Sequence, residues 1–295
     1  MELLNFFNRY EGDRIICLGR FDGIHKGHRL VIEKGLEIKN DLKKDVNLSV
    51  FLFRQTTESE TSNRILTFGE NVSRLEKLSV DEVIYAYETQ DFYNTDKDLF
   101  LSILMRNFNP VAIVCGEDYT FGKNREGTAK YLQNFCLNNG IVCRIAPILY
   151  AHGEKISSTL IKKLLSEGNV KTANALIGGK YFISGKVLHG RAVGRTIGFP
   201  TLNVEIPPQK APLKTGVYAT ETIIDGKRYK SVTNYGSAPT FDETKVLSET
   251  FVTGFNEDIY GKEVIIEFIG YLREDVKFDS VESLKKQLDE DVKKL

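Results

Sequence analysis

The chain has 295 residues, of which 41% are apolar and 27% charged, and its 40 basic residues balance its 40 acidic ones. This is an ordinary composition for a folded protein and excludes a largely disordered chain. The zero net charge excludes a general attraction to nucleic acid or to an acidic membrane surface, so any phosphate chemistry must depend on local sites.

Neither membrane insertion nor secretion is predicted. No apolar run approaches the roughly 20 residues that a bilayer span needs, and the N-terminal MELLNFFNR lacks the layout of a signal peptide. The cysteines show no C-x-x-C spacing, so we expect neither a metal site nor a disulfide. We therefore expect a cytoplasmic protein.

The first part of the chain alternates strand-like and helical patterns. The expected strands are residues 14–18, 48–53, 82–87, 111–115 and 141–146, and the expected helices include 30–42, 97–108 and 160–177. Such alternation predicts an α/β fold, a doubly wound parallel sheet that binds its ligands at the carboxyl ends of the strands. Gly178-Gly179 ends the helical pattern, and we place the first domain at residues 1–179.

The second domain, residues 180–295, has a different pattern. The expected strands are 181–188, 216–224, 229–234, 250–255 and 263–272, and a helical pattern returns only at 281–292. Short alternating strands separated by Gly- and Pro-containing loops predict a small antiparallel β-barrel with a terminal helix.

A glycine-rich loop, GRFDGIHKGH at residues 19–28, joins the first strand to a helix. A helix start presents free N–H groups and a positive dipole end to a phosphate, and glycines allow the ligand to approach closely. His25 and His28 could donate hydrogen bonds as charge develops between the α- and β-phosphates of a nucleotide. The candidate phosphate-binding residues of the loop are Gly19, Phe21, Asp22, Gly23 and Gly27.

Two further motifs follow in the same domain: GEDYTFG at residues 116–122 and ISSTLIK at 156–162. Consecutive hydroxyl groups at a helix start, with a cation one turn in, form a second anion-binding site. Its candidate residues are Ser157, Ser158, Thr159 and Lys162.

In this order the three motifs resemble the FAD synthetase branch of the H-x-G-H nucleotidyltransferase superfamily, with its patterns G-x-F-D-G-x-H-x-G-H, G-E-D-F-x-F-G and I-S-S-T-x-I-R. The resemblance implies adenylyl transfer without a covalent enzyme intermediate, with His25 and His28 catalytic and Asp118 and Phe121 binding the flavin. The chain departs from the family at Lys162, which replaces an arginine, and after Phe53, where RQTT replaces the x-P-H-P of the family's F-x-P-H-P.

The second domain opens with GKVLHGRAVGRTIGFPTLN at residues 185–203, which resembles the riboflavin kinase pattern G-x-V-x-x-G-x-x-x-G-R-x-x-G-F-P-T-A-N. Gly190 and Gly194 belong to an expected flap whose backbone amides meet the nucleotide phosphates. Thr201 and Asn203 offer hard oxygen ligands, which suit Mg²⁺ bound with ATP.

Three later positions extend this resemblance. NYGSAPTF at residues 234–241 resembles the family's N-I-G-x-x-P-T-F, and Glu249, which we expect at the start of a strand, stands at the glutamate that activates the ribityl 5′-hydroxyl. Arg273 matches an arginine near the flavin nucleotide.

The resemblance implies a bifunctional enzyme that phosphorylates riboflavin to FMN and adenylylates FMN to FAD, with ATP and flavins as its only expected partners. Two alternatives stay open: a riboflavin kinase with a degraded first domain, and a non-catalytic flavin-binding regulatory protein. The sequence leaves the oligomeric state open.

Overall fold

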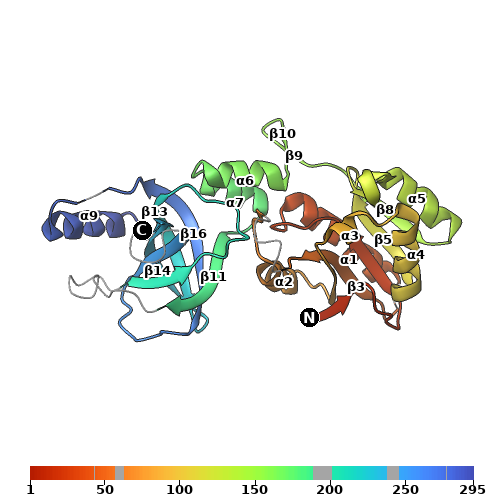
Figure 1. Ribbon diagram of the computed structural model, residues 1–295, viewed down its shortest axis with the longest axis horizontal. Coiled ribbons are helices and arrows are strands. Elements are labelled where there is room, and N and C mark those ends of the chain that lie inside the picture. Colours follow the sequence, from red (N-terminus) through yellow and green to blue (C-terminus); the bar gives the residue numbers. More distant parts are fainter. Residues whose placement is uncertain (43, 57–62, 189–200, 238–245, 277) are drawn as a thin grey trace. The chain divides into compact units, whose positions relative to one another are not determined.

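The computed structural model describes residues 1–295 except 43, 57–62, 189–200, 238–245 and 277. Its contacts divide the chain into two compact units, Met1–Ser158 and Thr159–Leu295 (Figure 1). This division by contacts falls before the expected domain boundary between residues 179 and 180. That the two activities are divided at residues 179 and 180 stays a prediction.

The first unit is built on a sheet of six parallel strands in the order β1-β4-β3-β2-β5-β8. The strands are β1 (Glu2–Asn5), β4 (Glu82–Tyr87), β3 (Asn47–Arg54), β2 (Arg14–Leu18), β5 (Pro110–Gly116) and β8 (Val142–Ala146). Five of them match the expected strands. The edge strand β1 was not predicted, because it is short and buries only Leu4 fully.

Helices cover both faces of this sheet, as a doubly wound fold requires. Along β2, Ile15 and Cys17 pack with α1 (Lys26–Leu42) and α2 (Phe68–Glu76). Ile16 and Leu18 point the other way and pack with α4 (Lys97–Phe108) and α5 (Ala129–Asn138). The continuous apolar run of β2 therefore fills two cores.

Several short elements lie in the connections between the main strands and helices and after β8. They are α3 (Gln90–Tyr93), β6 (Thr120–Phe121), the 3₁₀ turn η2 (Lys123–Arg125), β7 (Gly127–Thr128), β9 (Tyr150–Ala151) and β10 (Glu154–Lys155). β6 pairs with β7 and β9 with β10, both antiparallel.

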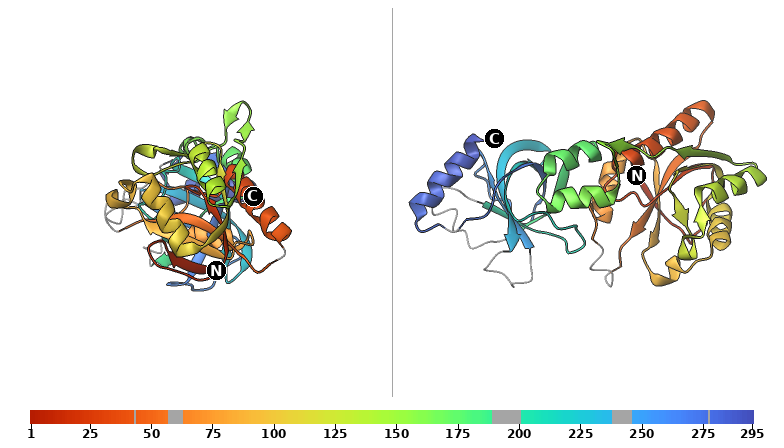
Figure 2. Two further views of the ribbon diagram at one scale, coloured as in Figure 1. Left: turned by 90° about the vertical axis from the view of Figure 1, so that its right-hand side faces the viewer. Right: turned by 90° about the horizontal axis from the view of Figure 1, so that it is seen from above.

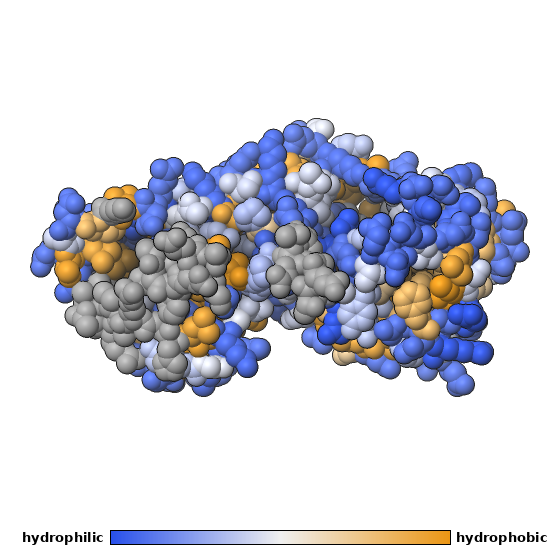
Figure 3. All heavy atoms as spheres, viewed as in Figure 1, coloured by the Kyte–Doolittle hydropathy of each residue, from blue (hydrophilic) through white to orange (hydrophobic). Residues whose placement is uncertain are grey.

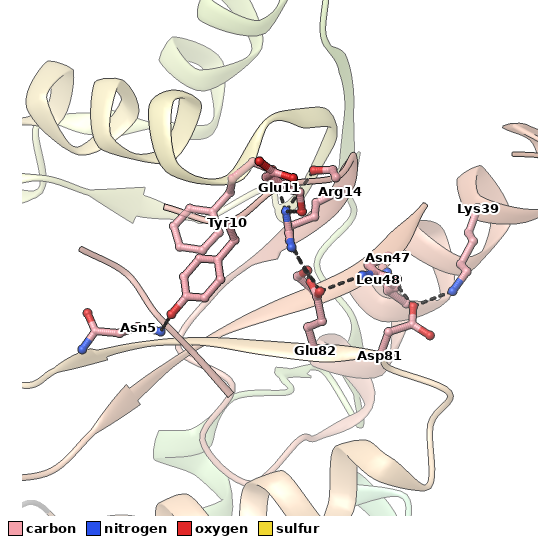
Figure 4. A network of polar contacts seen from close by, with 12 residues as sticks. Asn5, Tyr10, Glu11, Arg14, Lys39, Asn47, Leu48, Asp81 and Glu82 are labelled. Carbon is pink, nitrogen blue, oxygen red and sulfur yellow. Dashed lines mark hydrogen bonds and ion pairs between the residues drawn. The ribbon is translucent and has the colours of Figure 1, made fainter. Parts of the chain in front are cut away.

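A buried ion pair fastens the amino edge of the sheet (Figure 4). Arg14 Nε lies 2.8 Å from Glu82 Oε2, and both side chains are at most 4% exposed. Ser49 Oγ and Asn47 Nδ2 also donate to the Glu82 carboxylate, at 2.6 and 2.7 Å. Because the first residues of β2, β3 and β4 meet here, the opposite edge is left for ligands.

The second unit contains a closed antiparallel barrel with the strand order β11-β12-β15-β14-β13-β16. The strands are β11 (Tyr181–Leu188), β12 (Thr201–Glu205), β15 (Val246–Val252), β14 (Lys227–Ser237), β13 (Gly216–Ile224) and β16 (Glu263–Arg273). The pairing of β11 with β16 closes the barrel. β12, whose first three residues are the end of the riboflavin kinase motif, was not among the expected strands.

The helical stretch expected at 160–177 is two helices, α6 (Ser158–Ser166) and α7 (Val170–Ile177). Gly168 separates them at φ +80°, a conformation that only glycine adopts easily. Asn174 of α7 ties this helix to the barrel, because its side chain donates to the Phe268 carbonyl and accepts from the Tyr181 amide.

A ladder of hydroxyl groups fills part of the barrel interior. Thr233 Oγ1 lies 2.8 Å from Thr220 Oγ1 and 2.9 Å from Thr250 Oγ1, and Ser231 extends the chain of bonds. These side chains are almost fully buried, so the ladder satisfies polar groups that would otherwise destabilise the core.

The terminal helix α9 (Val281–Lys293) follows the last barrel strand (Figure 2). On the face drawn in Figure 3, apolar side chains form small patches within a mostly polar surface. Over the described part of the chain, no helix combines the length and apolar character that a bilayer span requires.

Candidate active sites

The loop between β2 and α1 has an unusual backbone that is held from one side. Phe21 and Ile24 adopt positive φ angles of 44° and 48°. The Ile65 amide donates to Asp22 Oδ1 at 2.8 Å, and Asn71 and Arg74 of α2 bond the amide and carbonyl of Gly23. Asp22 and Gly23 therefore fix the conformation of the loop through these bonds. Neither residue is among those that line the cavity described next.

A cavity of about 560 Å³ opens at the carboxyl edge of the sheet. It brings together residues from all three N-terminal motifs. The predicted site residues that line it are Gly19, Phe21, His25, Gly27, His28, Asp118, Phe121, Ser157 and Ser158. Residues of the three motifs thus lie around one cavity, and their roles in binding and catalysis stay predictions.

His25 and His28 lie face to face in the cavity, with ring centroids 3.6 Å apart. Burial lowers the pKa of His25 to about 4 and holds the pKa of His28 well below its usual value. Both imidazoles are therefore neutral at pH 7, and each can donate one hydrogen bond. Within the described residues, the buried Nδ1 of His28 has no hydrogen-bond partner.

One wall of the cavity is aromatic. Phe51, Phe53, Phe92, Phe100 and Tyr119 line it beside Phe121, and the rings of Tyr119 and Phe121 stack with centroids 5.6 Å apart. Such a wall suits a planar heteroaromatic ligand. The sequence interpretation missed all of these except Phe121, although two of them end the apolar run of β3.

The remaining N-terminal candidates lie as follows. Asp118 forms an ion pair with Lys155 of β10, and both side chains are partly exposed. The Ser158 hydroxyl donates to the Asp22 carbonyl at 3.0 Å, which joins the third motif to the first. Thr159 and Lys162 belong to α6 in the second unit, where Thr159 is exposed and Lys162 half-buried.

The second candidate site is on the outer face of the barrel. Glu249 of β15 faces Asn203 of β12 on one side and Asn234 of β14 on the other. Its chain neighbours Ser248 and Thr250 are fully buried inside the barrel, so alternation along the strand turns Glu249 outward. Thr201 is two residues from Asn203 and shares this face.

The structure corrects one expectation here. Glu249 lies in the middle of β15, which begins at Val246, and not at the start of a strand. Glu249 is exposed at the surface of the barrel, but neighbouring groups partly desolvate its carboxyl, and this desolvation, with the charge of Asp275 second, raises its pKa. A carboxylate with a raised pKa is a better proton acceptor.

The side-chain oxygens of the two flanking asparagines have no hydrogen-bond partner in the described parts of the chain. Asn203 is 7% exposed, and its Oδ1, like that of Asn234, is buried and unsatisfied. An unsatisfied buried oxygen is costly, and a ligand group or cation would relieve that cost. Among the described residues, no group of three or more His, Cys, Asp or Glu side chains is arranged to hold a metal ion.

A second cavity, of about 400 Å³, adjoins this region. Thr201 lines it together with Val187, Val252, Phe255 and the loop at 256–260. The sequence interpretation did not anticipate that loop. Gly190 and Gly194 lie outside the described residues, as does the end of the motif at 234–241.

Arg273 is held by the terminal helix. Its Nε and Nη2 atoms lie 2.9 and 2.8 Å from Asp291 Oδ2, and the Asp291 side chain is fully buried. The arginine therefore has a structural partner, and its predicted contact with a flavin nucleotide stays a prediction.

Two family models match the chain in the same order as the two candidate sites. The FAD synthetase family matches residues 8–160, and the riboflavin kinase family matches residues 177–295.

Whole-length relatives agree with the family models. The chain is 31% identical to the bifunctional riboflavin kinase/FMN adenylyltransferase of Haemophilus influenzae, over 94% of this chain and 91% of that one. It is 32% identical to the protein of that name from Bacillus subtilis, over 94% and 90% of the two chains.

A solved structure from Streptococcus pneumoniae, titled a macrolide-efflux protein, superposes with a TM-score of 0.87. It is 30% identical to this chain and matches 99% of it and 97% of its own length. The structural match thus extends across both units, as the matches to the curated relatives do, and the chain belongs to the bifunctional riboflavin kinase/FMN adenylyltransferase family.

Proposed function

We propose that this chain makes FMN from riboflavin and ATP with residues 180–295, and FAD from FMN and ATP with residues 1–179. The observation that carries the proposal is that each family match coincides with a site of suitable chemistry. The first has paired imidazoles in a cavity with an aromatic wall, and the second has a carboxylate between two amides.

In the adenylyl-transfer step, an oxygen of the FMN phosphate attacks the α-phosphorus of ATP. The bond from that phosphorus to the bridging β-phosphate oxygen breaks, and pyrophosphate leaves. The N–H groups of His25 and His28 stabilise the charge on the phosphates, and neutral imidazoles serve here as donors without releasing a proton. Ser157 and Ser158 offer further donors, Gly19 and Gly27 admit the phosphates, and Asp118 and Phe121 bind the flavin.

In the kinase step, Glu249 takes the proton of the ribityl 5′-hydroxyl as its oxygen attacks the γ-phosphorus of ATP, and ADP leaves. The raised pKa of Glu249 supports this role, because it brings the base closer to the pH at which it works. Phosphoryl transfer otherwise needs alignment and charge neutralisation more than covalent chemistry.

Mg²⁺ fits the second site. The unsatisfied Oδ1 of Asn203 and the hydroxyl of Thr201 are hard oxygen ligands on one face of β12. Mg²⁺ often keeps several waters and takes phosphate oxygens as ligands, so a cage of carboxylates is not needed. When bound, it supplies neutralisation of the ATP phosphates.

We further propose that the chain works in the cytoplasm, where ATP is available, with ATP and flavins as its partners and without nucleic acid or membrane. The balance of 40 basic and 40 acidic residues supports the second part, because it provides no general attraction to either polyanion.

Incubation of the protein with riboflavin, ATP and Mg²⁺, followed by chromatography, tests the proposal. FMN and FAD are the expected products. FMN alone would favour a kinase with a degraded first unit, an alternative that the altered segment after Phe53 keeps open. Tight flavin binding without turnover would favour a regulatory binding protein.

A further inference from the structure

A charged cluster lies at the carboxyl ends of three neighbouring strands. The strands β4, β3 and β2 are adjacent in the sheet. Glu88 directly follows β4, Gln55 directly follows β3, and Arg20 is two residues beyond β2. Because carboxyl ends of parallel strands meet at one edge, these three side chains converge there, beside the cavity of the first unit.

The carboxylate of Glu88 organises this cluster. Its Oε1 accepts from Arg20 Nη2 at 2.9 Å and from the Tyr93 hydroxyl. Its Oε2 accepts from Gln55 Nε2 at 3.3 Å and from the guanidinium of Arg64. Four donors on one carboxylate fix its position and leave it little freedom to turn.

The cluster carries more positive than negative charge, since two guanidinium groups share one carboxylate. Burial by itself would raise the pKa of Glu88, but Arg64, Tyr93 and Arg20 together hold it below its usual value. Glu88 therefore stays ionised at neutral pH, and the cluster keeps an excess positive charge.

Only part of the cluster reaches the cavity. The side chains of Arg64 and Glu88 are 4% and 9% exposed, whereas that of Arg20 is 61% exposed. Arg20 and Tyr93 line the cavity together with Phe53, whose ring packs against Tyr93 at 5.8 Å between centroids. The buried pair thus supports an exposed guanidinium at the cavity wall.

Arg20 keeps capacity for a ligand. A guanidinium has five N–H donors. Among the described residues, Arg20 uses one of them, on Nη2, in its hydrogen bond to Glu88. The fork geometry of the remaining donors matches a phosphate group, which arginine can bind through two parallel bonds.

We propose that Arg20 binds a phosphate group of a substrate of adenylyl transfer, and that Glu88 is a positioning residue that holds Arg20 toward the cavity. The inference rests on the proposed function of the first unit and adds to it a binding residue outside the histidine pair. Gln55 belongs to the segment after Phe53 where the chain departs from its family. Its side chain donates to Glu88, so the altered segment takes part in the cluster.

The Arg20→Ala variant of the full chain tests the binding role, and the exposure of Arg20 makes the variant compatible with folding. We expect a Michaelis constant about ten- to hundredfold higher for one anionic substrate, as for loss of a hydrogen bond between charged groups. A change confined to FMN identifies its monophosphate as the ligand. A change for ATP, and for pyrophosphate in the reverse reaction, identifies the polyphosphate. Unchanged constants for all three would overturn the proposal.

Controls separate local binding from net charge and from folding. Arg9→Ala removes the same charge from an exposed position outside the cavity and should change none of these constants. Riboflavin phosphorylation, measured on the same Arg20→Ala preparation, should equal that of the wild type. Arg20→Lys keeps the charge without the fork and should fall between wild type and Arg20→Ala.

A double-mutant cycle tests the positioning role of Glu88. Glu88→Gln should raise the Michaelis constant of the same substrate about three- to tenfold, and it should add nothing in the Arg20→Ala background. Fully additive effects would refute positioning through Arg20, since they would show that Glu88 acts independently.

The outcome remains decisive if the first unit makes no FAD. Absence of FAD from the wild type would refute the proposed function of that unit, and titrations with FMN and with pyrophosphate would then judge Arg20. Weaker binding of either ligand by Arg20→Ala would still support a phosphate contact, whereas identical titrations would overturn it.

Discussion

The imidazole ring of His28 stacks on that of His25, with the two planes inclined by 20° and the His28 amide 3.4 Å from His25 Nδ1. The amide contact engages His25 Nδ1 as an acceptor, so a neutral His25 carries its proton on Nε2. Because the rings are stacked, both can donate a hydrogen bond to the same ligand group in the cavity.

Removal of one ring should therefore stop most adenylyl transfer. We expect His28→Ala to lower the rate of FAD formation from FMN and ATP by about 10²–10³-fold, the usual cost of losing one donor to developing charge. Riboflavin phosphorylation by the same protein should be unchanged. Chromatography of both products measures both effects, and undiminished FAD formation would remove the loop from the mechanism.

The stability of the first unit should fall in mild acid because of the same pair. The pKa of His25 is lowered to about 4 in the folded state from an ordinary value of 6.5, so the unfolded chain takes up the proton first. The contribution of His25 to the free energy of unfolding is fully present above pH 6.5. It falls toward pH 4 by about 1.4 kcal/mol per pH unit.

Urea unfolding between pH 7 and pH 4.5 measures this loss. The variant His25→Gln cannot bind that proton, and its free energy of unfolding should depend less steeply on pH. An equal slope in the two proteins would show that other groups cause the acid sensitivity.

Glu249→Gln should slow FMN formation by about 10²–10⁴-fold, the contribution of a positioned general base. Because the base must be deprotonated and partial desolvation raises its pKa, the wild-type rate should fall as the pH drops through a value above the usual range of a glutamate. The acid limb should be absent in the variant. Glu263→Gln, an exposed glutamate of β16, is the matched control and should retain wild-type activity.

Lys162→Arg tests the departure from the family in the third motif. A guanidinium offers a planar fork where the ammonium is a point charge. If Lys162 limits adenylyl transfer, the variant should form FAD faster, as measured by initial rates at saturating FMN. No change would assign any weakness to the segment after Phe53.

Glu82→Gln should destabilise the first unit without touching its cavity. The substitution leaves the buried Arg14 guanidinium without its carboxylate, and breaking a buried pair on one side costs about 3–5 kcal/mol. Denaturant unfolding monitored by circular dichroism measures the difference. A loss below about 1 kcal/mol would contradict the prediction, because it would show that the Arg14–Glu82 ion pair contributes little to the stability of the unit.

Local patterns in the sequence predicted most of the elements. β2, β4 and α4 have the expected bounds, because each is a compact apolar or amphipathic run with clear ends. The first cavity followed from the strand–loop–helix context of the glycine-rich motif, since ligands gather at the carboxyl edge of a parallel sheet.

Contacts between distant residues were not predictable in this way. Asn234 faces Glu249 because of strand order and register, which no local pattern records. Arg64, which precedes α2, meets Glu88, which follows β4, because the fold brings two segments far apart in the sequence together. The middle position of Glu249 in its strand was also not predicted, because the first residues of β15, Val246, Leu247 and Ser248, show no clear alternation of apolar and polar side chains.

The hydroxyl ladder inside the barrel has a consequence for the outer face. Thr250 of β15 bonds Thr233 of β14, and a slip of one residue between these strands would exchange the two faces of β15. The slip would bring the carboxylate of Glu249 into a nearly dry interior and expel a bonded hydroxyl. The buried hydroxyl groups therefore also fix the alignment of the site on the outer face. A misaligned barrel cannot persist as a folded, inactive form, because the slip that displaces the base also makes the barrel unstable.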